Sequence, residues 1–218
     1  YNIKRLRNHA SLAMWCGNNE IYEGMRYWGW DKKYTDPAIM EGMKRGYDKL
    51  FRELLPRKVQ ELDPDRFYMH GSPYEANWGR PESWKIADSH NWGTWYGQKP
   101  FESFDTEIPR FMSEYGFQAF PEMKTIATFA TPEDYALESE VMNAHQKASI
   151  GNFLIKKTMG LYYKVPEDFE QLVYLGLVLQ GQGMRHGMEA HRRNRPYCMG
   201  TLYWQLNDSW PVVSWSSI

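Results

Sequence analysis

The sequence has 218 residues, a length that suits one large domain or two small ones. Its formal net charge is -1, so its electrostatics favour neither nucleic acid nor an anionic membrane as a partner. No apolar run approaches the roughly 20 residues of a membrane span. The two cysteines, Cys16 and Cys198, suggest neither a disulfide framework nor a zinc pattern. Because both lie in apolar runs, we expect buried free thiols.

Helices are predicted from caps and from apolar residues at helical spacing. Asp36-Pro37 is a helix start, with Asp36 as N-cap and Pro37 in the first turn, and the apolar stripe that follows runs to Leu62. Residues 21–30, rich in Gly and aromatics, are expected to form a loop instead. Two further helices are predicted over residues 133–160 and 166–190.

Short strand-like runs alternate with these helices and with long loops, and polar residues follow the runs. The runs lie at residues 12–16, 66–70, 88–92, 110–113 and 199–206. This alternation predicts an α/β fold with a parallel sheet. In a (β/α)8 barrel the active site is built from the carboxyl ends of the strands, where these polar residues would lie.

Two of the runs end in a Glu. The apolar run Leu12–Cys16 stops at Gly17 and leads into Asn18-Asn19-Glu20, and we expect it to be a strand buried on both faces. The run Arg110–Ser113 leads into Glu114. Two carboxylates on rigid strand ends suggest glycoside hydrolysis, in which one acts as acid and base and the other as nucleophile or base.

Aromatic side chains are abundant, with 10 Trp, 15 Tyr and 10 Phe, and many stand beside Gly, Asn and Pro in predicted loops. This placement favours rings that stack on sugar faces over a core of the same size. His90, Asn91, Trp92 and Tyr96 form a polar and aromatic segment that suits a binding cleft better than a core.

The stretch Trp15-Cys16-Gly17-Asn18-Asn19-Glu20 resembles the acid/base motif of glycoside hydrolase family 2, in the form of its β-mannosidase branch. Ser113-Glu114-Tyr115-Gly116-Phe117 resembles the family's nucleophile motif, and the run from Met199 to Pro211 resembles its last barrel strand. The resemblance covers nearly the whole chain. It implies strands four to eight of a (β/α)8 TIM barrel, with residues 1–218 a C-terminal part of the catalytic domain, truncated at both ends.

The resemblance also implies roles. Glu20 would be the general acid/base, Glu114 the nucleophile, and Asn19 the contact to the sugar 2-hydroxyl. The substrate-binding aromatic and histidine residues would be Trp28, Trp78, His90, Trp92, Tyr96 and Trp204. The implied reaction is retaining exo-hydrolysis of terminal β-D-mannose, from oligosaccharides or glycoprotein glycans, with no metal or other cofactor.

Alternatives stay open at this point. Another family 2 exo-glycosidase, such as a β-galactosidase, β-glucuronidase or exo-β-glucosaminidase, would share much of the pattern, and an inactive carbohydrate-binding half-barrel would lack the activity. The resemblance implies export or a lysosomal location, and it implies flanking β-sandwich domains and the rest of the barrel in the full-length protein. Retaining enzymes hold their carboxylates about 5–5.5 Å apart and inverting ones about 6.5–9.5 Å, a distance that sequence spacing does not give.

Overall fold

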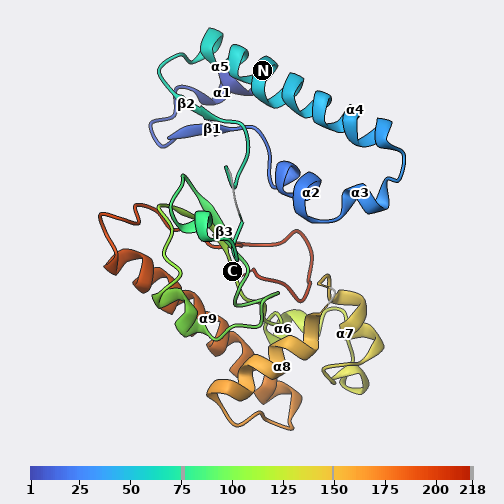
Figure 1. The fold of residues 1–218 in the computed structure, drawn as a ribbon. Helices are drawn as coiled ribbons and strands as arrows, with labels where there is room; N and C mark the ends of the chain where they lie inside the picture. The colour runs from blue at the N-terminus through green and yellow to red at the C-terminus, as the bar shows by residue number, and fades with distance from the viewer. Residues whose placement is uncertain (75–76, 149, 217–218) are drawn as a thin grey trace. The chain divides into compact units, whose positions relative to one another are not determined.

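The computed structural model describes residues 1–74, 77–148 and 150–216. The chain divides into two compact units, Tyr1–Ser89 and His90–Ile218, which are described in turn (Figure 1). The described residues are rich in helix, and their named strands form two two-stranded sheets. In those same residues, no helix combines the length and the apolar character needed to cross a bilayer.

The first unit is a small parallel sheet accompanied by helices. Its elements are α1 (Asn2–Leu6), β1 (Met14–Cys16), α2 (Ile21–Tyr27), α3 (Trp30–Lys33), α4 (Pro37–Tyr47), a π-helix (Asp48–Leu54), α5 (Leu55–Leu62), β2 (Phe67–Met69) and a 3-10 helix (Pro81–Trp84). The predicted start of α4 is confirmed, since the Asp36 carboxylate accepts a 2.9 Å hydrogen bond from the backbone N–H of Ala38. Pro56 falls in the first turn of α5, a position that tolerates proline.

The expectation of an irregular loop at residues 21–30 is wrong, because α2 and α3 occupy most of it. The side chain of Asn18 accepts a 3.1 Å hydrogen bond from the backbone N–H of Ile21, which satisfies a free donor in the first turn of α2. Met25 then packs into a buried cluster with Met40 and Tyr47. Tertiary packing of an apolar face therefore outweighs the local Gly content.

Strand β1 pairs in parallel with β2, in a register that places Met14 beside Phe67 and Cys16 beside Met69. The expectation that this strand is buried on both faces is wrong: Met14 and Trp15 are half-buried and Cys16 is exposed. The physical reason is that this sheet has two strands in the described part of the chain, so β1 has a neighbouring strand on one side and is less covered than a central strand. Both cysteines are free thiols, but Cys198 alone of the two is buried, so the prediction for Cys16 fails on burial.

The second unit is mainly helical. Its elements are β3 (Ser89–Asn91, whose first residue belongs to the first unit), a 3-10 helix (Phe101–Asp105), β4 (Met112–Tyr115), α6 (Met123–Ile126), a 3-10 turn (Pro132–Asp134), α7 (Glu140–His145), α8 (Gly151–Tyr162) and α9 (Phe169–Arg193). Helices α8 and α9 lie side by side (Figure 1). Strand β3 is hydrogen-bonded to β4.

The predicted strand at residues 199–206 does not form a regular strand, although its first half runs beside β4. The backbone N–H of Met112 donates to the carbonyl of Gly200 over 2.9 Å, and the N–H of Leu202 donates back to the carbonyl of Met112 over 2.8 Å. Thr201 forms a single parallel bridge with Met112. The segment therefore has the direction of the predicted strand without its length.

The single helix predicted over residues 133–160 is also wrong. Thr131 and Asp134 form a capping box, but this turn ends at Tyr135. Ser139 then caps α7 with a 3.3 Å hydrogen bond from the backbone N–H of Met142. The prediction over 166–190 is confirmed by α9, which continues unbroken to Arg193.

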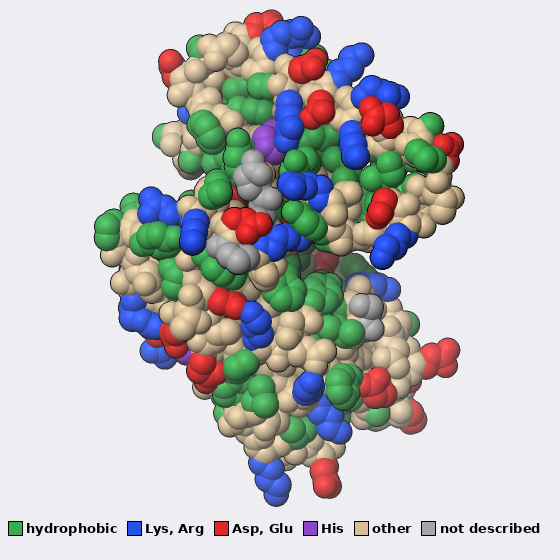
Figure 2. All heavy atoms as spheres, viewed as in Figure 1, with side chains coloured by type: hydrophobic (Ala, Val, Ile, Leu, Met, Phe, Trp, Pro, Cys, Tyr) green, Lys and Arg blue, Asp and Glu red, His purple; other side chains and the backbone are tan. Residues whose placement is uncertain are grey.

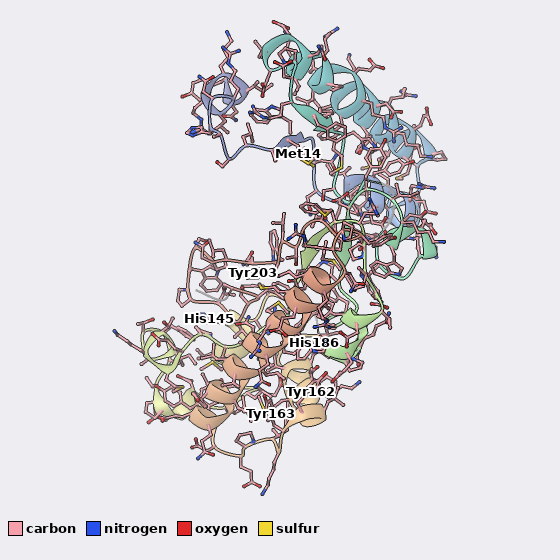
Figure 3. All side chains as sticks on the ribbon, turned by 90° about the vertical axis from the view of Figure 1, so that its left-hand side faces the viewer. Met14, His145, Tyr162, Tyr163, His186 and Tyr203 are labelled. Atoms are coloured by element: carbon pink, nitrogen blue, oxygen red, sulfur yellow. The ribbon has the colours of Figure 1, made fainter. Side chains whose placement is uncertain are left out.

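Aromatic packing and a hydrogen bond to a tyrosine hydroxyl stabilise the second unit. The Trp95 and Phe117 rings meet edge to face, with centroids 5.2 Å apart, inside the core. Tyr162, at the end of α8 (Figure 3), accepts a 2.7 Å hydrogen bond from the backbone N–H of Phe101, and burial raises the pKa of Tyr162 to about 12. Acidic and basic side chains are interspersed on the face shown in Figure 2, in keeping with the near-zero net charge.

Candidate active site

Glu20 lies at the end of the β1–β2 ladder. The parallel hydrogen bonding continues beyond the strands, and the backbone N–H of Glu20 donates to the carbonyl of Ser72 over 2.9 Å. Glu20 has φ +56°, a left-handed conformation that is uncommon outside glycine, and α2 begins at the next residue. Strained backbone of this kind is concentrated at functional sites. The ladder and the helix together fix the direction in which this carboxylate leaves the backbone.

Asn18 supports this geometry. Its amide donates to the carbonyl of His70 over 2.7 Å and to the hydroxyl of Tyr47 over 3.2 Å, while its oxygen caps α2. The Tyr47 hydroxyl also lies 2.7 Å from Nδ1 of His70, and burial raises the pKa of Tyr47. A Cβ atom on Gly17 would lie 2.4 Å from the carbonyl oxygen of His70, so glycine alone fits this turn. The residues before Glu20 thus hold the turn in place.

Asn77 is a contact of Glu20 that the sequence did not predict. Its Nδ2 donates to Oε1 of Glu20 over 3.2 Å, and Asn77 is itself buried. Its Oδ1 accepts a 2.8 Å hydrogen bond from the backbone N–H of Trp78, which fixes which end of the amide faces Glu20. The polar and aromatic run Asn77-Trp78-Gly79-Arg80 was the available signal in the sequence.

The loop after β2 is held in place by the buried carboxylate of Asp88. Asp88 accepts hydrogen bonds from the hydroxyl of Ser72 over 2.6 Å and from the backbone N–H of Tyr74 over 2.8 Å. The carbonyl of Ser72 also accepts the hydrogen bond from the backbone N–H of Glu20. Asp88 therefore holds in place the segment to which Glu20 is hydrogen-bonded. Asp88 was not among the expected site residues.

The predicted nucleophile Glu114 lies on β4 and is buried. The indole N–H of Trp92 donates to its Oε1 over 3.0 Å, and Nδ1 of His90 lies 3.7 Å from its Oε2. Two of the residues predicted from the sequence, Trp92 and His90, therefore lie at the carboxylate of a third, Glu114. The indole N–H of Trp92 and the ring of His90 thus fix the orientation of this carboxylate.

Aromatic residues pack beside Trp92 and β4 in the second unit. The exposed ring of Tyr96 meets Trp92 edge to face, with centroids 6.0 Å apart, and Trp215, which sequence reasoning missed, meets Trp92 at 5.6 Å. Trp204 is partly exposed, and its backbone N–H donates to the carbonyl of Tyr115 over 2.7 Å. Exposed rings such as those of Tyr96 and Trp204 suit stacking on a sugar ligand.

The remaining predicted residues lie in the first unit. Asn19 is exposed, as a residue that contacts a ligand must be. Trp28 is exposed and meets Trp30 edge to face at 6.2 Å, while Trp78 is half-buried beside Asn77. The ligand contacts expected of Trp28 and Trp78 thus stay predictions.

Comparison with known proteins gives relatives along the whole chain. No family model matches it. The chain is 36% identical to β-mannosidase B of Neosartorya fischeri and 35% identical to β-mannosidase B of Emericella nidulans, in alignments that cover all of this chain. It covers 26% and 27% of those two proteins, so the chain spans about a quarter of the length of the curated relatives it matches.

A solved structure gives the same result. The crystal structure of the β-D-mannosidase from Dictyoglomus thermophilum matches 98% of this chain and 25% of its own chain, with a TM-score of 0.84 and 36% sequence identity. Sequence and fold therefore both relate the chain to β-mannosidases.

Proposed function

We propose, from the premise that this chain is a segment of a β-mannosidase-type glycoside hydrolase, that the protein containing it removes terminal, non-reducing β-D-mannose with retention of configuration. The observation that carries the proposal is the similarity along the whole chain to proteins named β-mannosidase. The geometry that supports it is the gathering of Trp92 and His90 at the carboxylate of Glu114.

We further propose that the chain forms strands four to eight of a (β/α)8 barrel. The parallel pairing of β1 with β2, and the parallel bridge between β4 and Thr201, support this placement. Glu114 is the penultimate residue of β4 and Glu20 lies four residues after β1, so both would lie toward the carboxyl face of such a barrel, where catalytic residues are found. The rest of the barrel, and flanking β-sandwich domains, would lie in the remainder of the protein.

In the proposed reaction the ionised carboxylate of Glu114 attacks the anomeric carbon. The bond to the leaving oxygen breaks, and that oxygen takes the proton of Glu20, which leaves a glycosyl ester on Glu114 and a carboxylate on Glu20. Glu20 then removes a proton from water, the hydroxide oxygen bonds to the anomeric carbon, and Glu114 leaves as a carboxylate. Two inversions give net retention, and the order requires Glu114 ionised and Glu20 protonated at the start.

The side chains around each carboxylate have separate parts in this scheme. The N–H of Trp92 donates to Oε1 of Glu114 and Nδ1 of His90 lies 3.7 Å from Oε2, so both residues would orient the carboxylate for attack. Asn19, exposed next to Glu20, would bond to the sugar 2-hydroxyl, a contact that strengthens in the oxocarbenium-like transition state. Tyr96 and Trp204 would offer ring faces to the substrate.

The test is a panel of aryl glycosides given to the intact protein, with product configuration followed by proton NMR. The β-mannoside is expected to be hydrolysed with the highest kcat/KM, and β-mannose is expected to appear before mutarotation. Preference for the β-galactoside, β-glucuronide or β-glucosaminide would replace the sugar assignment. If α-mannose appeared first, the retaining mechanism would be wrong.

A further inference from the structure

The segment that carries Asn77 is clamped to α2 by Arg80. Nη2 of Arg80 donates to Oε1 of Glu23 in an ion pair, and Glu23, on α2, is 4% exposed. The guanidinium carbon of Arg80 lies 3.5 Å from the centroid of the Tyr27 ring, also on α2. Arg80 therefore contacts α2 one turn and two turns after Glu20, by charge and by stacking.

The same guanidinium reaches the backbone of Asn77. Nη1 of Arg80 donates to the carbonyl of Asn77 over 3.4 Å, and the buried hydroxyl of Ser83 donates to that same carbonyl. The amide of Asn77 in turn donates to Glu20. A continuous chain of contacts thus runs from Glu23 through Arg80 and Asn77 to the carboxylate of Glu20.

This chain also balances charge beside Glu20. Burial raises the pKa of Glu23, and the negative charge of Glu20 acts in the same direction, while the hydrogen bond and charge of Arg80 and the charge of Arg26 lower it. Without Arg80, the buried carboxylate of Glu23 would lose the cation that compensates it. Glu20 and Glu23, one helical turn apart, would then repel each other without the charge of Arg80 between α2 and the loop.

We propose that Arg80 is a positioning residue for proton donation by Glu20. It acts through Glu23 and the Asn77 carbonyl to hold the Asn77 amide against one oxygen of Glu20, so that the protonated oxygen is directed to the leaving group. The inference rests on the proposed function of Glu20 as the acid. Arg80 itself contacts no reacting atom in this account.

The test compares Arg80→Met with Arg80→Lys in the intact protein on two aryl β-mannosides, one with a good and one with a poor leaving group. Good leaving groups need little protonation, so a misplaced acid slows the poor substrate selectively. For Arg80→Met we expect a loss of roughly 10- to 100-fold in kcat/KM on the poor substrate and a much smaller loss on the good one. Arg80→Lys, which keeps the charge, is expected to recover part of the loss.

Asn77→Ala is the second variant, because it leaves the Arg80–Glu23 pair intact and keeps the test open if Arg80→Met does not fold. It is expected to show the same selective loss. Arg45→Met is the matched control: Arg45 pairs with Glu41 on the exposed face of α4, and its removal is expected to change neither substrate.

Equal losses on both substrates for Arg80→Met and Asn77→Ala would show a structural role and overturn the proposal, as would no loss on either. Labelling of Glu114 by a 2-fluoro mannosyl fluoride, measured on the same variants, separates this failure from that of the proposed function. If labelling proceeds but selectivity is absent, the Arg80 inference alone is wrong. If Glu20→Ala itself lacks selectivity, the acid role of Glu20 is wrong.

Discussion

The indole N–H of Trp92 donates a 3.0 Å hydrogen bond to Oε1 of Glu114, and both side chains are buried. A hydrogen bond to a charged group is worth about 1.5–3 kcal/mol. It also orients the carboxylate of the proposed nucleophile. The relationship joins a residue of the loop after β3 to one on β4, so it depends on the fold of the second unit.

The first prediction concerns this bond. Trp92→Phe keeps an aromatic ring and removes the donor, and we expect kcat/KM to fall roughly 10- to 100-fold, the range that corresponds to the bond's free energy. The control is Trp95→Phe, because the indole nitrogen of Trp95 is buried without a hydrogen-bond partner among the described residues. Trp95→Phe should lower the free energy of unfolding and leave kcat/KM of the folded protein unchanged. Equal rate losses in the two variants would contradict the role assigned to Trp92.

The second prediction concerns Glu20. Glu20→Ala removes the proposed proton donor, and general acids contribute typically 10²–10⁴-fold. We expect a loss of this size on a poor leaving group and a far smaller one on a dinitrophenyl leaving group, measured as kcat/KM for both substrates. Similar losses on the two substrates would contradict the acid role.

The third prediction concerns packing inside α9. A Cβ atom at Gly183 would lie 2.4 Å from the ring of Phe101, whereas a Cβ at Gly181 meets nothing within 4 Å. Gly183→Ala should therefore cost about 1–3 kcal/mol of unfolding free energy through overpacking. Gly181→Ala, two residues away on the same helix, should gain about 0.5–1 kcal/mol from helix propensity. Denaturant unfolding of both variants measures the difference, and a Gly183→Ala protein as stable as Gly181→Ala would contradict the packing.

The fourth prediction is a pH dependence of stability that comes from His191. Burial lowers the pKa of His191 to about 4, from an ordinary value near 6.5, and its Nδ1 lies 2.9 Å from the hydroxyl of Thr201. The unfolded chain therefore takes up the proton first as the pH falls. Stability is full above pH 6.5 and is lost progressively between pH 6.5 and pH 4, by about 3 kcal/mol in all.

His191→Gln removes this titration and gives the control. Its unfolding free energy, measured by denaturant at several pH values, should depend less on pH between 6.5 and 4 than that of the parent. An unchanged slope in the variant would show that other groups cause the dependence.

The correct predictions from the sequence concern features that depend on neighbouring residues. Asp36 and Pro37 start α4 as expected, because capping depends on neighbouring residues alone. Glu20 and Glu114 lie at the ends of their extended segments, as the polar residues after each apolar run indicated. Trp92 and His90 lie beside Glu114, a contact that the sequence did not predict, and their predicted role in substrate binding stays a prediction.

The features that the sequence did not predict depend on contacts between segments that are distant along the chain. Asn77 meets Glu20 across 57 residues of sequence, and no local pattern encodes such a pair. Helix α2 forms in a Gly-rich stretch because Met25 finds a buried cluster with Met40 and Tyr47, which propensity does not register. Helix α9 runs through Gly181 and Gly183 despite their low helix propensity, and at Gly183 the absent side chain makes room for Phe101.

The most direct test of the central claim is mechanism-based labelling of the intact protein. It is incubated with 2-deoxy-2-fluoro-β-mannosyl fluoride, digested, and its peptides are weighed. Because the fluorine slows breakdown of the glycosyl ester, the account predicts a fluoromannosyl mass on the peptide that contains Glu114, and none on that peptide in Glu114→Gln. A label on another carboxylate, or none after prolonged incubation of an enzyme that hydrolyses β-mannosides, would contradict the assignment of Glu114 as the nucleophile.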